Sequence, residues 1–400
     1  MSSILKTSDL IRSIKLRAFI PSSQETFTDE ALLDFATEEV NIGLVPLIQR
    51  MHEEHLINYI DVPLIRDVKR YAMPARAHGN KLRDVALIDE NDNIFEMHRY
   101  SLSEISDLTN TTTYINSRGF YIENNDVILS NFDVLVGYRL RFYFYMRPNK
   151  LVKEELGSTV TSIIDDFEIN QNTPISFSIA NITSVDNVTV IEAPDHGLSN
   201  GDYVLISGTN VTPSIEGFHA ISRLSSNTFS IAVNSTSIGS TSGTVELAVK
   251  VKRIGMKSLI PRFLTSETFD FVQNISPNKI IHYDIPFVSK NQLANEISFP
   301  AELVPNVVVG SYINVAEETF VPNIPTELHP ILAQRVAVVC LEAMGDEQNK
   351  QSAERKLAKM EQDAGTFLDN RVEGAVQKIK SRNSPLVNTL NTLGRRNRRW

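Results

Sequence analysis

Residues 327–367 read ELHPILAQRVAVVCLEAMGDEQNKQSAERKLAKMEQDAGTF, and apolar residues recur in this stretch at spacings of three and four. Such spacing is typical of amphipathic helices. We predict a first helix that begins at Pro325 or Thr326 and ends at Gly345, because glycine favours the backbone conformation that closes a helix. A second, long helix is predicted to follow over residues 347–382.

The N-terminal segment shows the same periodicity. TFTDEALLDFATEEV, at residues 26–40, has helical spacing of its apolar side chains. Pro46 is expected to kink or split the helix that follows, because its ring cannot donate a backbone hydrogen bond. We therefore predict that residues 1–61 and 326–383 pack together as one helical bundle.

Between the helical ends the apolar period falls to two. VGYRLRFYFYMRP, at residues 136–148, alternates apolar side chains with arginine and tyrosine, as in a half-buried strand. We predict a β-rich region over 62–164, a small sandwich or barrel over 165–250, and strands with loops over 251–325. The predicted fold class is α+β: a helical bundle with a long C-terminal helix, carrying inserted antiparallel β domains.

The basic C-terminal tail, residues 384–400, is the clearest electrostatic feature. Residues 371–400 carry a charge of +7 against −9 for the whole chain, so the rest of the chain carries −16. Three interpretations are open: nucleic-acid contact, a solvated end, or docking into an acidic, aromatic-lined groove of a partner. We favour docking, because the tail holds the single tryptophan of the chain. Its anchor residues would be Arg395, Arg396, Arg398, Arg399 and Trp400.

Residues able to carry out catalysis are not arranged in any recognisable motif. His52 and His55 are three apart, whereas zinc-protease helices place two histidines four apart. Asp165 and Asp166 are adjacent, so on a strand they point to opposite faces. Cys340 lies in an apolar run and is expected to be an inert, packed thiol. We expect no enzymatic activity, no metal, no cofactor and no membrane association.

One part of the chain resembles a β module that recurs in structural proteins of tailed bacteriophages. Residues 193–233 contain its His-Gly-Leu turn, Gly-Asp pair, alternating strand, Ser-Gly-Thr, Gly-Phe and Asn-Thr-Phe strand. In physical terms the glycines permit tight turns. The residues that we assign to the turns are His196, Gly197, Gly201, Asp202 and Gly208. The module occurs at many positions in virions, so it does not define the role of this chain.

A second resemblance involves both ends of the chain. FPAELVPNVVVGSYINVAEETFVPNIPTELHP and the residues that follow, up to Phe367, are similar to head-to-tail connector (portal adaptor) proteins of short-tailed bacteriophages. The resemblance implies a dodecameric ring in the virion, made in the host cytoplasm. Its partners would be copies of itself, the portal protein and the next tail protein. DNA would pass through the ring without sequence-specific binding during genome ejection.

Three other roles are considered. A tail-tube, baseplate or fibre-attachment protein would share the β module but would not contact a portal. A glycan-binding module requires exposed aromatic residues on the 165–250 block, and we expect most of the aromatic residues there to be buried. A hydrolase is the weakest alternative, because no acid–base pair is found.

Overall fold

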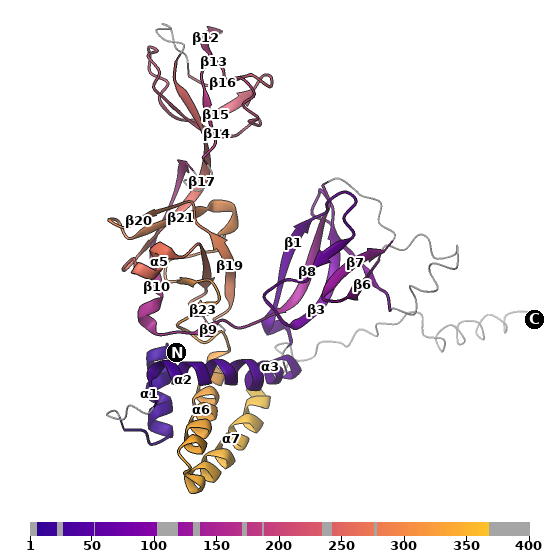
Figure 1. The fold of residues 1–400 in the computed structure, drawn as a ribbon, viewed down its shortest axis with the longest axis vertical. Helices are drawn as coiled ribbons and strands as arrows, with labels where there is room; N and C mark the ends of the chain where they lie inside the picture. The colour runs from indigo at the N-terminus through magenta and orange to yellow at the C-terminus, as the bar shows by residue number, and fades with distance from the viewer. Residues whose placement is uncertain are drawn as a thin grey trace, which may run out of the picture.

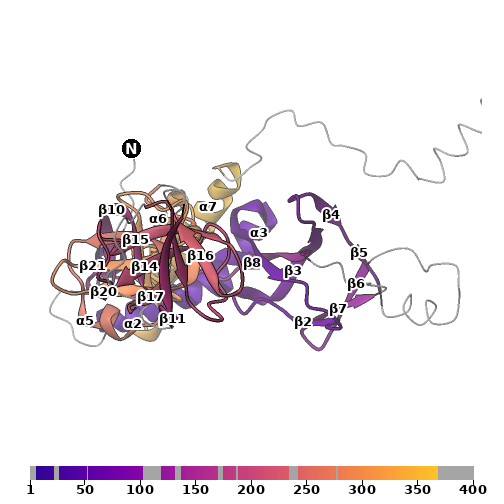
Figure 2. The ribbon, with the colours of Figure 1, turned by 90° about the horizontal axis from the view of Figure 1, so that it is seen from above.

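The computed structural model describes residues 6–21, 27–51, 53–101, 119–130, 137–169, 174–185, 188–233, 242–275 and 278–367. Figure 1 shows an elongated molecule with four parts, to which we give names. The helical unit (residues 6–56 and 324–367) lies at one end. The central sheet (150–169 and 248–323) follows it, and the distal module (174–247) forms the other end. The lateral unit (57–146) extends sideways from this column, as the view from above in Figure 2 shows.

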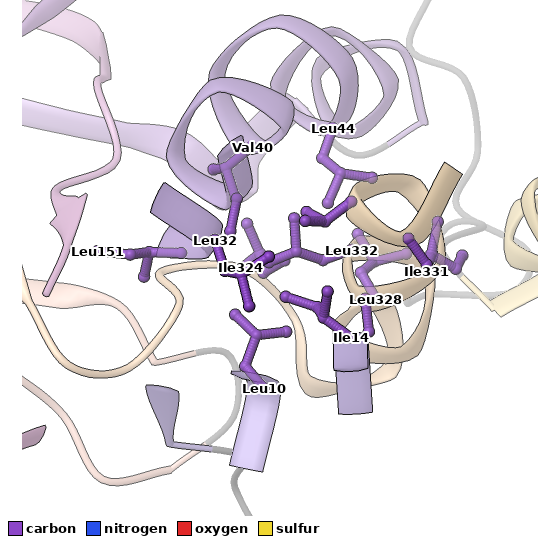
Figure 3. Packing of buried hydrophobic residues seen from close by; sticks show 14 of the residues in the cluster. Leu10, Ile14, Leu32, Val40, Leu44, Leu151, Ile324, Leu328, Ile331 and Leu332 are labelled. Carbon is purple, nitrogen blue, oxygen red and sulfur yellow. The ribbon is translucent and has the colours of Figure 1, made fainter. Parts of the chain in front are cut away.

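The helical unit combines the two ends of the chain. Its helices are α1 (Thr7–Arg17), α2 (Asp29–Glu38), α3 (Val45–Met51), α6 (His329–Ala343) and α7 (Glu347–Phe367), with short turns η2 (Glu53–Leu56) and η6 (Thr326–Leu328). Figure 3 shows side chains from both ends of the chain packed together, and all of those that it labels are buried. Removing such apolar surface from water is the main favourable term that holds these helices together.

A π-helical turn, η1 (Glu39–Leu44), joins α2 to α3. It ends two residues before Pro46, which has no N–H to donate and whose ring would crowd the carbonyl four residues earlier. The N–H of Val45 donates to the carbonyl of Val40, five residues back. The wider turn therefore carries the chain past the proline, and the helix that was expected to kink or split becomes two α-helices joined by π geometry.

The end of α6 follows the predicted pattern. Gly345 adopts a φ of +71°, and the N–H of Asp346 donates to the carbonyl of Leu341 at 3.1 Å, the arrangement of a Schellman motif. The carboxylate of Asp346 then accepts from the N–H of Asn349 at 3.2 Å and so caps α7. Gly345 and Asp346 thus separate the two helices, as their sequence indicated.

The lateral unit consists of two small sheets packed face to face. One has the strand order β1 (Ile57–Pro63), β8 (Arg139–Met146), β3 (Ala77–Ile88), β4 (Ile94–Glu96), and the other β2 (Arg70–Ala72), β7 (Asp126–Ser130), β6 (Gly119–Glu123), β5 (His98–Arg99). Strand β8 buries Leu140, Phe142 and Phe144 completely. The first two join the core between the sheets, while Phe144 packs toward the central sheet.

The central sheet and the distal module share one 13-stranded sheet. Its main path runs through β12 (Asn181–Val185), β13 (Val188–Glu192), β16 (Thr228–Ile231), β15 (Gly217–Arg223), β14 (Tyr203–Ser207), β17 (Thr244–Met256), β10 (Ser158–Ile169), β22 (Tyr312–Val315), β18 (Thr268–Val272) and β19 (Ile280–Pro286). Off this path are β11 (Ser176–Ser178), β20 (Ser289–Asn291) and β21 (Glu296–Pro300). Short elements complete the central part: β9 (Lys150–Leu151), β23 (Glu318–Thr319), η4 (Glu154–Leu156), α5 (Pro261–Thr265) and η5 (Ala301–Leu303).

Two long antiparallel strands, β10 and β17, connect the distal module to the central sheet. Their register pairs Val160 with Met256 at one end and Ile169 with Ala248 at the other. Both strands run through the boundaries expected at residues 165 and 250. The module and the central sheet nevertheless have separate cores, since the buried apolar residues of the module all lie between Phe177 and Leu247.

The predicted fold class is wrong. The structure is mostly β, with 41% strand against 27% helix, and a large antiparallel sheet takes the place of a helical bundle with a long C-terminal helix. The helices that were predicted at the two ends do form, but they make up one end of an elongated β protein. Helix α7 is described to Phe367, and the rest of the expected long helix lies outside the described residues. The apolar periodicity located the helices, because it reflects interactions between near neighbours. It did not show how many strands from distant parts of the chain would pair in one sheet.

Candidate functional site

The anchor residues predicted in the basic tail, Arg395, Arg396, Arg398, Arg399 and Trp400, lie outside the described residues. The structure therefore offers no geometry for that site. His52 also lies outside them, and no group of three or more His, Cys, Asp or Glu side chains within the described ranges could hold a metal ion.

The predicted turn residues of the β module lie in the distal module, in the segment before β14 and at its end. His196 is buried, its Nδ1 accepts from the N–H of Leu198 at 3.0 Å, and its ring meets Phe229 edge to face. Asp202 accepts from the N–H of Ser199 at 2.7 Å. These contacts hold the turn together and leave little of His196 available to a ligand.

The three predicted glycines of the module all adopt positive φ. Gly197, Gly201 and Gly208 have φ values of +62°, +92° and +72°. An L side chain is disfavoured there, so these positions serve the turns of the module.

Aromatic side chains at the base of the distal module are more exposed than expected. Phe229 is buried, but Tyr203 and Phe218 are 37% and 43% exposed. Phe167, on β10, stacks on Tyr203 with ring centroids 4.0 Å apart, and its centroid lies 6.5 Å from that of Phe218. The expectation of buried aromatic residues is therefore wrong for this group, which lies where the module joins the central sheet.

A cleft of about 780 Å³ opens beside these aromatic residues. Phe167 on β10 and Phe218 on the distal module line it, together with the exposed residues Asn291, Gln292 and Leu293 of the β20–β21 hairpin. Its volume falls within the range of about 300–1,000 Å³ that is usual for small-molecule sites. We therefore take this cleft as the candidate site.

Ionic side chains cover the floor of the cleft. Arg253, on β17, pairs with Asp166, with Glu168 at 3.3 Å and with Glu296 at 3.7 Å. The register explains this cluster: Arg253 lies opposite Ile164 on β10 and Ser298 on β21, and residues two apart share a face. One guanidinium on β17 thus holds three carboxylates, two from β10 and one from β21.

Hydroxyl groups complete the arrangement around Glu168. Its carboxylate accepts a hydrogen bond from Ser298 at 2.8 Å and another from Ser289. Lys290 also lines the cleft, but its ammonium donates to the carbonyls of Leu264 and Ser266 and lies 3.8 Å from the ring centroid of Phe287. The Lys290 ammonium therefore makes these contacts with backbone carbonyls and an aromatic ring, and not with the carboxylates that pair with Arg253.

Sequence reasoning missed this cleft almost entirely. The sequence predicts only that Asp166 points to the opposite face from Asp165, yet Asp166 pairs with Arg253, 87 residues away. The one usable signal was the acidic run DDFE on β10 and the basic run KVKR on β17, which pair with Asp165 opposite Lys252. Opposite charges on two strands indicate pairing, but only once their register is known.

Cys340 occupies the position expected of a packed thiol. It is completely buried in α6 within the helical core, and burial raises the pKa of its thiol to about 11. A thiol with a raised pKa forms little thiolate near neutral pH and reacts slowly.

The chain was compared with known protein families and with curated protein sequences. No protein-family model matches the chain, and no curated protein sequence matches it. Among the helices in the described ranges, none has the length and apolar character needed to cross a membrane.

Proposed function

We propose that the chain is a virion structural protein that forms a connector ring between the portal vertex and the tail of a phage and provides a passage for DNA. Two features support this proposal. Residues 193–233 resemble the phage structural module, and the N- and C-terminal segments combine into one helical unit. Ring subunits need extended surfaces for their neighbours, and they need no catalytic cleft.

The observation that carries the proposal is the exposed apolar pair Leu16 and Phe19 at the end of α1, which are 70% and 73% exposed. Leu16 lies in the last turn of α1, and Phe19 follows the C-cap residue Ala18. Phe19 closes the helix with a φ of +55°, and the N–H of Ile20 donates to the carbonyl of Lys15 at 2.9 Å. This is the Schellman position, where glycine is normally preferred.

In an isolated molecule, a phenylalanine at position 19 destabilises the folded state for two reasons. The left-handed backbone costs an L residue roughly 1–2 kcal/mol relative to the right-handed one. The exposed ring also loses the stabilisation that burial would provide. Both costs are offset when a neighbouring subunit covers the ring, so we assign Leu16 and Phe19 to the contact between ring subunits.

Exposed apolar pairs also occur on other parts of the molecule. Ile94 and Phe95 lie on β4 of the lateral unit, and Val308 and Val309 lie in a loop of the central sheet. Single exposed apolar residues are ordinary, whereas adjacent pairs on several units suit a subunit with several neighbours. The acidic body would offer few contacts to DNA phosphates in a central passage.

The test is assembly of the purified chain with the portal protein of the same phage, followed by sedimentation velocity and electron microscopy. We expect rings on the portal for the natural chain, and at least a tenfold loss of assembly for the double variant Leu16→Ser, Phe19→Ser. The matched control is Leu224→Ser, because Leu224 is 59% exposed but lies on the distal module.

Two further results bear on the proposal. Deletion of residues 385–400 should leave the fold intact and abolish portal binding. A chain that stays monomeric at all concentrations and never binds the portal would contradict the proposal and favour a tail-tube, baseplate or fibre-attachment role.

A further inference from the structure

The cleft beside Arg253 has no role in the proposed ring. We propose that it binds a neutral carbohydrate chain, which makes it a glycan-binding site at the junction of the distal module and the central sheet. The inference does not depend on the connector role, because it is carried by the chemistry of the cleft alone.

The charges of the cleft first exclude other ligand classes. The carboxylates of Asp166, Glu168 and Glu296 surround one guanidinium, that of Arg253, so an anion such as a phosphate would be repelled by the acidic excess. A cation would have to compete with Arg253, which already pairs with all three carboxylates. A neutral ligand avoids both costs, because no further charge has to leave water.

The hydrogen-bonding groups suit hydroxyl groups in particular. A hydroxyl both donates and accepts, and the cleft offers acceptors on its carboxylates and donors on Arg253. The hydroxyls of Ser289 and Ser298 donate to Glu168 and can still accept, whereas the side-chain amides of Asn291 and Gln292 can both donate and accept. A sugar ring carries neighbouring hydroxyls that match such closely spaced donors and acceptors.

The aromatic residues of the cleft would bind the apolar face of a sugar ring. One face of a pyranose ring presents C–H groups, which pack against the negative face of an aromatic ring. Phe218 is 43% exposed, and Phe167, whose ring is supported by Tyr203 at 4.0 Å, also lines the cleft. The exposed ring of Phe218 is unfavourable in an empty cleft and favourable under an apolar sugar face.

The size and shape of the cleft indicate a chain of several sugars. The volume is about 780 Å³, and the cleft extends from Phe218 on the module to Leu293 at the tip of the β20–β21 hairpin. Leu293 is 98% exposed, so it is available to contact a ligand that leaves the cleft. The elements on both sides are strands of one sheet, so the site is held on rigid elements.

The experiment is titration calorimetry of the full chain with neutral hexasaccharides: glucose in α-1,4 and β-1,4 linkage, N-acetylglucosamine in β-1,4 linkage, and galactose and mannose oligomers. Spermine and the peptide GRRNRRW are the cationic probes, and inorganic phosphate is the anionic probe. We expect at least one oligosaccharide to bind, and Phe218→Ala and Glu168→Gln each to raise its Kd at least tenfold.

The matched control is Phe95→Ala, because Phe95 is also a half-exposed phenylalanine but lies in the lateral unit. It should leave the Kd unchanged within twofold. Phe218 is a surface side chain, so its removal should preserve the fold, which thermal unfolding will verify. If no oligosaccharide binds, if only a charged probe binds, or if Phe218→Ala binds as tightly as the natural chain, the inference is overturned.

Discussion

Arg76 and Asp270 form a buried ion pair that joins the lateral unit to the central sheet. Their closest N–O distance is 2.5 Å, and both side chains are almost completely removed from solvent. Asn149 contacts both: its side-chain oxygen accepts from Arg76 at 2.7 Å, and its amide donates to Asp270 at 2.7 Å. The backbone N–H groups of Asp284 and Glu317 also donate to Asp270. Segments far apart in the chain thus meet at one carboxylate.

Removal of Arg76 should destabilise the junction strongly. Arg76→Ala leaves the Asp270 carboxylate buried without its counter-charge, which typically costs about 3–5 kcal/mol. We expect a loss of this size in the free energy of unfolding, measured by urea denaturation. The matched control is Arg70→Ala, since Arg70 forms exposed, solvent-screened pairs with Glu123 and Asp126 that contribute little to stability. Equal losses in the two variants would show that the buried pair has no special role.

Gly43 allows Arg335 to approach the π-helical turn. A Cβ at position 43 would lie 2.2 Å from Nη1 of Arg335, whose guanidinium pairs with Glu39 at 3.0 Å and with Glu361 on α7. We expect Gly43→Ala to displace the guanidinium and to lower the free energy of unfolding by about 1–2 kcal/mol, as for a lost charged hydrogen bond.

The sign of this effect should reverse when the arginine is absent. In an Arg335→Ala background, Gly43→Ala should stabilise the protein by about 0.5–1 kcal/mol, because alanine is the better helix former. Chemical denaturation of the four proteins in this double-mutant cycle gives both values. Stabilisation in both backgrounds would mean that the contact with Arg335 does not constrain position 43.

The distal module should be separable from the rest of the chain. Ile169 and Ala248 are directly paired across β10 and β17, so a two-residue Asn-Gly turn can replace residues 170–247. Since the core of the module contains only residues of the module, we expect the shortened chain to keep the unfolding midpoint of the remaining core. Scanning calorimetry measures this, and an insoluble or uncooperatively unfolding product would contradict it.

Two histidines should make the protein less stable in mild acid. Burial lowers the pKa of His329 to about 4, and burial together with nearby Lys252 lowers the pKa of His282 to about 4. Both are neutral in the fold, whereas an unfolded chain protonates them near pH 6.5. The free energy of unfolding should therefore fall as pH decreases from about 6.5 to about 4, with a slope of at most about 1.4 kcal/mol per pH unit for each histidine.

The measurement is urea denaturation between pH 4 and pH 7.5. His329→Gln should flatten the slope, whereas His98→Gln should not, because His98 is exposed on β5. An unchanged slope in His329→Gln would show that His329 is protonated equally in both states.

Local elements were predictable because the forces that define them act over a few residues. The β3–β4 turn is an example: the Asp89 carboxylate accepts from the N–H groups of Asn91 and Asn93 at 2.8 Å, and Asp and Asn are residues that favour such turns. The ending of α6 at Gly345 is another. The candidate cleft was not predictable, since Asp166, Arg253 and Glu296 come together only through strand register.

By itself, the sequence determined where helices begin and end, where hairpins turn, and that the C-terminal residues are basic. Spacing, glycine and capping side chains act between near neighbours, and charge is a property of composition. Only the tertiary structure decided that strands from residues 158 to 315 form one sheet, that the helices occupy one end, and that Asp270 meets Arg76 across 194 residues. Those pairings depend on which distant surfaces bury one another, and no local pattern specifies that choice.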